Sequence, residues 1–214
     1  MIVLIGGIKG GTGKSTIATN LAVLRASYGH KTLLIDADEQ RSACDWANQR
    51  SEYFKDKYCD NEVTTIALSG KYLFSEVRKI CEDWDDIIID AGGRDTTSQR
   101  SALMIADRYV VPFKPRSFDV WTLASVKNLY EDASVHNHKL SPIIVINQAD
   151  ARGHDNEEAF EILMDWITFK EKMIFIGNRK SFANAAAEGL SIIEKGKDTK
   201  AQDELLNLFN SIYE

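Results

Sequence analysis

The chain has 214 residues, of which 44% are hydrophobic, so it can bury one sizeable core but is short for two full domains. Its net charge of -6 and pI near 5.3 would repel nucleic acids and anionic membranes, so any DNA binding must come from a local basic patch. The three cysteines are widely spaced without a Cys-x-x-Cys pair, which argues against a disulfide framework, a zinc site and a redox motif. We expect one domain over residues 1–214 of a cytoplasmic protein, since neither a secretion signal nor an apolar run near the ~20 residues that span a bilayer is present.

Short apolar runs rich in β-branched residues recur along the chain, and each predicts a buried strand. The runs are Ile2–Ile5, Thr32–Ile35, Val63–Leu68, Ile87–Ile89, Tyr109–Phe113, Ile143–Ile146 and Met173–Ile176. Segments with helical spacing lie between most of these runs, and a closing helix is expected after the last one. The helical segments are Ser15–Ser27, Ser42–Arg50, Tyr72–Trp84, Asp119–Ala133, Glu157–Phe169 and Asp198–Tyr213. The alternation predicts an α/β fold with a doubly wound, mainly parallel sheet and helices on both faces.

A glycine-rich motif, KGGTGKST, lies between the first predicted strand and the first predicted helix. Its glycines allow the backbone to curl so that N–H groups point at phosphate oxygens, and the helix adds its positive N-terminal dipole. Lys14 is expected to contact the β- and γ-phosphates, the Ser15 hydroxyl to bind Mg²⁺, and Thr16 to contact phosphate. The motif therefore predicts a P-loop nucleotide site. Its expected nucleotide-binding residues are Gly10, Gly11, Thr12, Gly13, Lys14, Ser15 and Thr16.

Two predicted strands end in carboxylates at the edge of the sheet where doubly wound folds bind ligands. After the second strand, Asp36 and Asp38 have the i, i+2 spacing that sends both side chains to the same side. After the fourth, Asp90 resembles the Walker B aspartate that holds the Mg²⁺ shell through water. Gly92 and Gly93 would then let the backbone approach the γ-phosphate and move when it leaves, as switch segments do.

Asn147 and Asp150 follow the sixth predicted strand, in the sequence NQAD, where an asparagine could contact the edge of a purine. The spacing is similar to the Asn-Lys-x-Asp motif of GTPases, in which the aspartate favours guanine. Gln148 stands where that motif has lysine, and the neighbouring motifs resemble those of an ATPase family rather than those of a GTPase, which implies ATP. We expect Asn147 and Asp150 to belong to the nucleotide site.

The glycine-rich motif resembles the deviant P-loop of the ParA/MinD group of ATPases, which includes plasmid and chromosome partition proteins. Ile8 stands where a strict Walker motif has glycine, and Lys9 is the extra lysine of the deviant form. The resemblance implies that Lys9 reaches across an ATP-bound homodimer to the nucleotide of the other subunit. A contact of Lys9 with its own nucleotide is the alternative.

The sequence Asp-x-Asp-x-Gln is similar to the second motif of the same family, and this likeness implies that Asp38 orients the attacking water. It places Asp36 near Mg²⁺ and the P-loop, so Ser15, Asp36 and Asp90 are the expected metal site. Lys9, Lys14 and Asp38 are the expected catalytic residues. The family usually has proline where this chain has Glu39.

Two later segments resemble the same family less specifically. Residues 112–119, PFKPRSFD, are similar to its Pro-x-x-Pro-Ser-x-x-Asp segment with Arg116 inserted, although a strand-to-helix loop with an N-cap at Ser117 or Asp119 explains them equally well. Residues 179–194 are similar to its Arg-x-x-aromatic-x-x-Ala-x-x-x-Gly segment.

The resemblance implies a partition or positioning ATPase that is nucleoid-associated, binds DNA without sequence preference as an ATP dimer, and hydrolyses ATP under a ParB-like or other adaptor protein. Candidate DNA contacts are Arg152, Lys170, Lys172, Arg179, Lys180, Lys195, Lys197 and Lys200. The chain begins at its first strand, so we expect no N-terminal helix-turn-helix region and no operator binding.

Other functions on the same nucleotide site remain open. A MinD-like membrane ATPase should end in a basic amphipathic helix, whereas residues 200–214 contain one lysine and three acidic residues. A metabolic ATP-dependent synthetase would need a substrate pocket that the sequence does not reveal, and iron–sulfur relatives need other cysteine spacings. A non-enzymatic nucleotide-gated protein would be favoured by loss of Lys14, Ser15, Asp38 or Asp90, yet all four are present.

Overall fold

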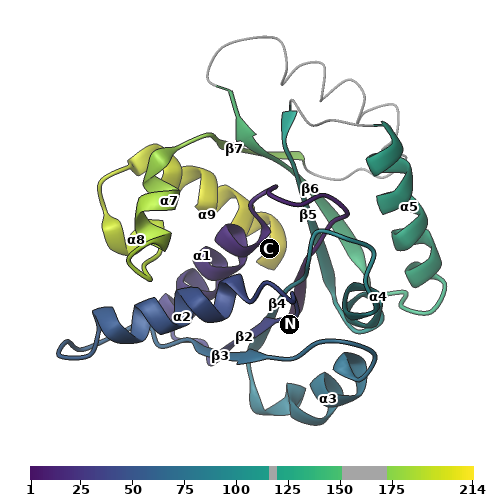
Figure 1. Ribbon diagram of the computed structural model, residues 1–214, viewed down its shortest axis with the longest axis horizontal. Coiled ribbons are helices and arrows are strands. Elements are labelled where there is room, and N and C mark those ends of the chain that lie inside the picture. Colours follow the sequence, from purple (N-terminus) through teal and green to yellow (C-terminus); the bar gives the residue numbers. More distant parts are fainter. Residues whose placement is uncertain (116–119, 151–172) are drawn as a thin grey trace.

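The computed structural model describes residues 1–115, 120–150 and 173–214 of the chain (Figure 1). The predicted helix Glu157–Phe169 lies outside the described residues, as do Arg116–Asp119. Three candidate DNA contacts, Arg152, Lys170 and Lys172, also lie outside them.

Seven strands form one sheet, and every neighbouring pair in it is parallel. The strands are β1 (Ile2–Ile5), β2 (Thr32–Asp36), β3 (Thr64–Ala67), β4 (Asp86–Asp90), β5 (Arg108–Phe113), β6 (Ser141–Ala149) and β7 (Met173–Gly177). Their order across the sheet is β3-β2-β4-β1-β5-β6-β7. All seven predicted strands are therefore present, and β1 lies at the centre with β4 and β5 beside it.

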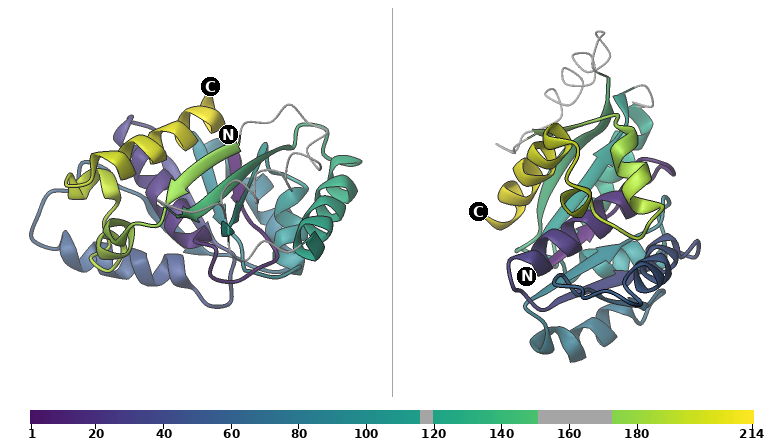
Figure 2. Two further views of the ribbon diagram at one scale, coloured as in Figure 1. Left: turned by 90° about the horizontal axis from the view of Figure 1, so that it is seen from above. Right: turned by 90° about the vertical axis from the view of Figure 1, so that its left-hand side faces the viewer.

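Helices cover both faces of the sheet, as predicted (Figures 1 and 2). One face carries α3 (Leu73–Ile80), α4 (Thr97–Leu103) and α5 (Val120–Ser134), with the 3₁₀ turn η1 (Cys81–Asp83) after α3. The other face carries α1 (Lys14–Ser27), α2 (Ser42–Tyr53), α7 (Lys180–Ala186), α8 (Ile192–Lys195) and α9 (Thr199–Tyr213). None of the helices in the described part of the chain is long and apolar enough to cross a membrane.

The two-residue period of the strands builds a separate hydrophobic core on each face. In β1, Leu4 packs into the core beneath α3, α4 and α5, whereas Val3 and Ile5 pack beneath α1 and α9. Because both faces are covered, the strands are apolar throughout, which explains why continuous β-branched runs predicted them correctly.

Three short helices were not predicted, namely α4, α7 and α8. They have seven, seven and four residues, too few for a helical period to stand out in the sequence. Two of them have a local cause nonetheless: the Thr96 side chain caps α4, and Ser191 with Glu194 forms a capping box on α8.

A buried arginine on α2 contacts both α8 and the segment before it. The Arg50 guanidinium donates to both carboxylate oxygens of Glu194, at 2.7 and 2.9 Å, and to the carbonyl of Gly189 at 3.2 Å. Gly189 has a φ of +70°, and a Cβ there would lie 2.1 Å from the backbone nitrogen of Arg50. Only glycine permits this approach, so the contact fixes α7 and α8 against α2.

We expect Gly189→Ala to lower the free energy of unfolding by about 2–4 kcal/mol, because the methyl group adds a backbone clash to the left-handed conformation. Gly196→Ala is the matched control: it has a similar φ of +67° but open space around it, so about 1 kcal/mol is expected. Urea unfolding followed by circular dichroism measures both, and equal losses would contradict the proposed clash.

Candidate nucleotide-binding site

The predicted P-loop joins the end of β1 to the start of α1 at Lys14, in the strand-to-helix context that the motif requires. Gly13 has a φ of +90°, and a Cβ on it would lie 2.2 Å from Nδ2 of Asn147. The loop is therefore pressed against β6, and glycine is required at this position for both its backbone conformation and its lack of a side chain.

Lys14 lies under the loop rather than in solvent. Its side chain is 6% exposed, and its ammonium group donates to the carbonyl of Lys9 at 2.9 Å. Burial lowers the pKa of Lys14, while the carboxylates of Asp90 and Asp38 offset part of the decrease. The ammonium group thus lies between the loop and the carboxylates of Asp38, a predicted catalytic residue, and Asp90, a predicted metal-site residue.

Asp90 is completely buried at the end of β4, beside the P-loop. Burial raises its pKa to about 7, and Asp36 and Asp38 contribute to the increase, whereas Ser15 and Lys14 oppose it. The Ser15 hydroxyl faces this carboxyl group, but neither Asp90 oxygen has a hydrogen bond of good geometry within the described residues. A carboxylate buried in this way needs a cation or water beside it.

These residues fit Mg²⁺. In the described part of the chain, no three His, Cys, Asp or Glu side chains cluster as a metal cage. Mg²⁺ usually takes only one or two protein groups and completes its shell with phosphate and water, which suits Ser15 and Asp90. The buried Thr12 hydroxyl also has no partner among the described residues, as expected of a group that faces a ligand.

Asp36 and Asp38 lie together at the end of β2, as their spacing predicted. Asp36 accepts the N–H of Asp38 at 3.1 Å and that of Cys44, in the first turn of α2, at 2.9 Å. Asp38 accepts the N–H of Gln40 at 3.1 Å. Asp36 therefore organises the loop that carries Asp38, a role that the sequence did not indicate, and its part in the metal shell stays a prediction.

The switch segment, residues 91–95 after β4, lies against both the P-loop and Asp38. A Cβ on Gly93 would lie 2.7 Å from Cα of Gly10, and one on Gly92 would lie 3.1 Å from Oδ1 of Asp38. The two glycines thus allow a close approach to the nucleotide loop and to the predicted catalytic aspartate.

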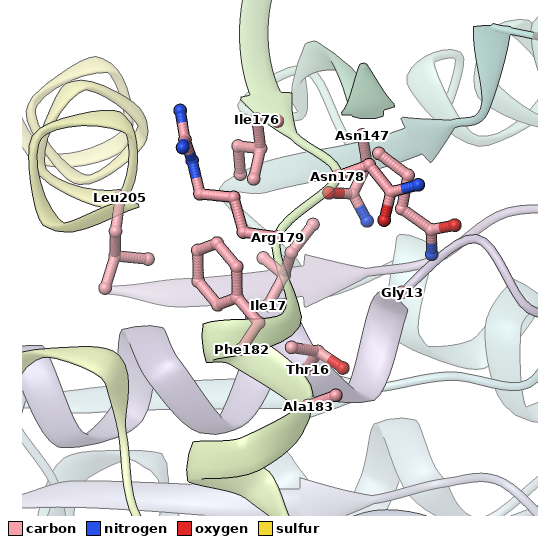
Figure 3. Close-up of a pocket in the computed structure, with 12 residues that line it drawn as sticks. Gly13, Thr16, Ile17, Asn147, Ile176, Asn178, Arg179, Phe182, Ala183 and Leu205 are labelled. Carbon is pink, nitrogen blue, oxygen red and sulfur yellow. The ribbon is translucent and has the colours of Figure 1, made fainter. Parts of the chain in front are cut away.

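A cavity of about 190 Å³ opens beside Gly13, between α1, β6, β7, α7 and α9 (Figure 3). Ile17, Phe182 and Leu205 supply apolar walls, and Asn147 and Asn178 supply polar groups. An apolar slot with a few polar groups next to a phosphate-binding loop is suited to a nucleotide base.

Asn147 links the polar side of the cavity to the P-loop. One N–H of its Nδ2 donates to the carbonyl of Thr12 at 2.6 Å, which fixes the amide beside the cavity. Its Oδ1 and its second N–H remain to face a base. Asp150 lies just after β6 and does not line the cavity in the described part of the chain, so its contact with the base stays a prediction.

An ion pair forms the rim of the cavity. Arg179 donates to the two carboxylate oxygens of Glu204 on α9, at 3.0 and 2.6 Å, and Glu204 also accepts the N–H of Gly177 at 3.0 Å. The predicted DNA contact Arg179 is therefore occupied within the protein. Lys195 likewise pairs with Glu188, whereas Lys180, Lys197 and Lys200 are exposed.

Residues 1–192 match the family model described as ATPase MipZ. The chain belongs to the MipZ ATPase family. Maintenance of carboxysome distribution protein A from Halothiobacillus neapolitanus is 24% identical over 210 residues, which cover 97% of this chain and 94% of that protein. An ATP complex of a McdA variant from Cyanothece has a TM-score of 0.80 at 17% identity, covering 99% of this chain and 95% of the other. MinD from Pyrococcus horikoshii, complexed with Mg-ADP, has a TM-score of 0.71 at 16% identity, covering 99% of this chain and 95% of that one.

The MipZ match confirms the predicted membership of the ParA/MinD group, and the solved structures confirm its P-loop α/β fold. The chain is therefore an ATPase of the group whose members act as positioning ATPases, and ATP with Mg²⁺ is its cofactor pair.

The raised pKa of Asp90 predicts a pH-dependent stability for the nucleotide-free protein. Between about pH 4 and pH 7 the folded chain keeps a proton on Asp90 that the unfolded chain has released, so this residue's contribution to the unfolding free energy falls as pH rises. Asp90→Asn removes that loss, and its stability relative to the wild type should increase by about 2–4 kcal/mol from pH 4 to pH 8. Urea unfolding in EDTA measures the difference.

Asp203→Asn, on the exposed side of α9, is the control and should show no such change with pH. If the unfolding free energies of Asp90→Asn and the wild type changed with pH in parallel, the raised pKa of Asp90 would be contradicted.

Proposed function

We propose that this MipZ-family protein is a ParA-type ATPase that forms an ATP-sandwich dimer, binds DNA without sequence preference, and uses hydrolysis to position a cargo. The observation that carries the proposal is the meeting of Lys9, Lys14, Asp38 and Asp90 around one glycine-rich loop. Relatives described as a carboxysome distribution protein and as ParA support the positioning role. The cargo would be chosen by a ParB-like or other adaptor protein that stimulates hydrolysis, at the nucleoid in the cytoplasm.

The residues divide the work of hydrolysis by their positions. Lys14 and the loop N–H groups hold the phosphates, and Ser15 and Asp90 hold the metal shell that neutralises developing charge on them. Asp38 is partly exposed, lies beside the switch segment and is close enough to Lys14 to affect its pKa. These contacts support the proposal that its carboxylate accepts a hydrogen bond from the attacking water and orients it.

Lys9 is proposed to act in the dimer. Its carbonyl is used internally by Lys14, and its residue begins the exposed rim of the P-loop at Gly10 and Gly11. A lysine at that rim can reach a nucleotide held by a facing subunit, which would make ATP binding and dimerisation depend on each other.

Asp38→Ala should keep ATP binding and ATP-dependent dimerisation but lose turnover by about 100-fold or more, because the water is no longer oriented. Phosphate release measures turnover, and light scattering measures the dimer. Asp45→Ala, an exposed carboxylate on α2, is the control and should hydrolyse ATP normally. Unchanged phosphate release from Asp38→Ala would remove Asp38 from the mechanism.

The DNA-binding function is tested by co-sedimentation with DNA of arbitrary sequence, with ATP, ADP or no nucleotide, over a salt series. Binding should occur only with ATP and weaken steeply with salt, since phosphate contacts release counterions. Lys9→Ala should bind ATP, stay monomeric and fail to bind DNA. A normal ATP dimer of Lys9→Ala would overturn the role of Lys9, and binding to anionic liposomes instead of DNA would overturn the DNA function.

A further inference from the structure

The end of β5 runs along the back of the P-loop. The N–H of Gly6 donates to the carbonyl of Val110 at 3.0 Å, and a Cβ on Gly7 would lie 3.8 Å from Cγ1 of Val111. The two residues that lead into the P-loop therefore continue the pairing of β1 with β5, and the residues that follow β5 emerge at the mouth of the phosphate site.

The alternation of β5 directs Lys114 toward that mouth. Val111 and Phe113 pack into the core beneath α3, α4 and α5, while Val110 packs on the opposite face, beneath α1. Lys114 continues the α1 side, and Pro115 favours an extended backbone at the residue before it. Its ammonium nitrogen lies 3.7 Å from the position of a Cβ on Gly11.

The ammonium group of Lys114 has no carboxylate partner in the described part of the chain, where it makes no hydrogen bond or ion pair. The carboxylates of Asp38 and Asp90 lie after β2 and β4, which are on the other side of β1 from β5. A partly buried cation beside the glycine-rich loop, whose N–H groups and helix dipole also present positive charge, is unfavourable unless an anion binds there.

We propose that Lys114 is a further phosphate-binding residue, whose ammonium group donates to a phosphate oxygen of the nucleotide in its own subunit. It would contact the phosphate chain from the β5 side, opposite Asp90, and so add a cation that belongs neither to the glycine-rich motif nor to the facing subunit. The inference rests on ATP binding but not on the proposed dimer or on DNA.

The test is the affinity of monomeric protein for MgADP and MgATP, measured by isothermal titration calorimetry. Lys114→Gln should weaken both by about tenfold, because a charge-assisted hydrogen bond is lost. Lys114→Arg should stay within about threefold of the wild type, since the charge and donors remain. The difference in nucleotide affinity between the wild type and Lys114→Gln should become smaller as the salt concentration rises from about 0.05 M to 0.5 M.

Lys139→Gln is the matched control, an exposed lysine before β6 at the opposite edge of the sheet, and should bind both nucleotides normally. An unchanged affinity of Lys114→Gln for MgADP would overturn the proposal. If only the ATP-dependent dimerisation changed in this variant, Lys114 would be a subunit contact and not a phosphate-binding residue. Equal weakening by glutamine and arginine would also overturn it, because packing rather than charge would then be responsible. Neither result depends on whether the wild type binds DNA.

Discussion

The buried ammonium group of Lys14 is the constraint around which the nucleotide site is built. A cation at this depth is costly unless dipoles and opposite charges surround it. The carbonyl of Lys9 and the carboxylates of Asp90 and Asp38 provide part of that surrounding. The same burial raises the pKa of Asp90, whose two carboxyl oxygens have no hydrogen-bond partner among the described residues. A bound nucleotide would supply phosphate oxygens to Lys14, and its metal would supply a cation to Asp90. Binding should therefore stabilise the fold.

The order of the strands brings these groups together from distant parts of the chain. Because β4 and β5 flank β1, the glycine-rich loop lies between the switch segment on one side and Lys114 on the other. β2 adds Asp36 and Asp38 beyond β4, while β6 and β7 form the side where the base cavity opens. A parallel sheet makes this possible because all its strands end at the same edge.

The sequence predicted the sheet, the P-loop and the three carboxylates because these depend on local patterns: continuous apolar strands, glycine spacing, and residues that directly follow a strand. It could not predict contacts made by side chains far apart in the sequence. The hydrogen bond from Asn147 to Thr12, the pair of Arg179 with Glu204 and the approach of Lys114 to Gly11 join different elements. Each uses an ordinary residue whose sequence neighbours give no sign of its partner.

The C-terminal helix has a practical consequence for work on this protein. Leu205 of α9 is a wall of the base cavity, and Glu204 holds both Arg179 and the end of β7. Shortening the chain before α9, or replacing the helix with a fusion partner, would open the pocket to solvent and remove the hydrogen bond that holds the end of β7. A variant or fusion made for assays of the ATPase therefore has to keep this helix docked on the sheet.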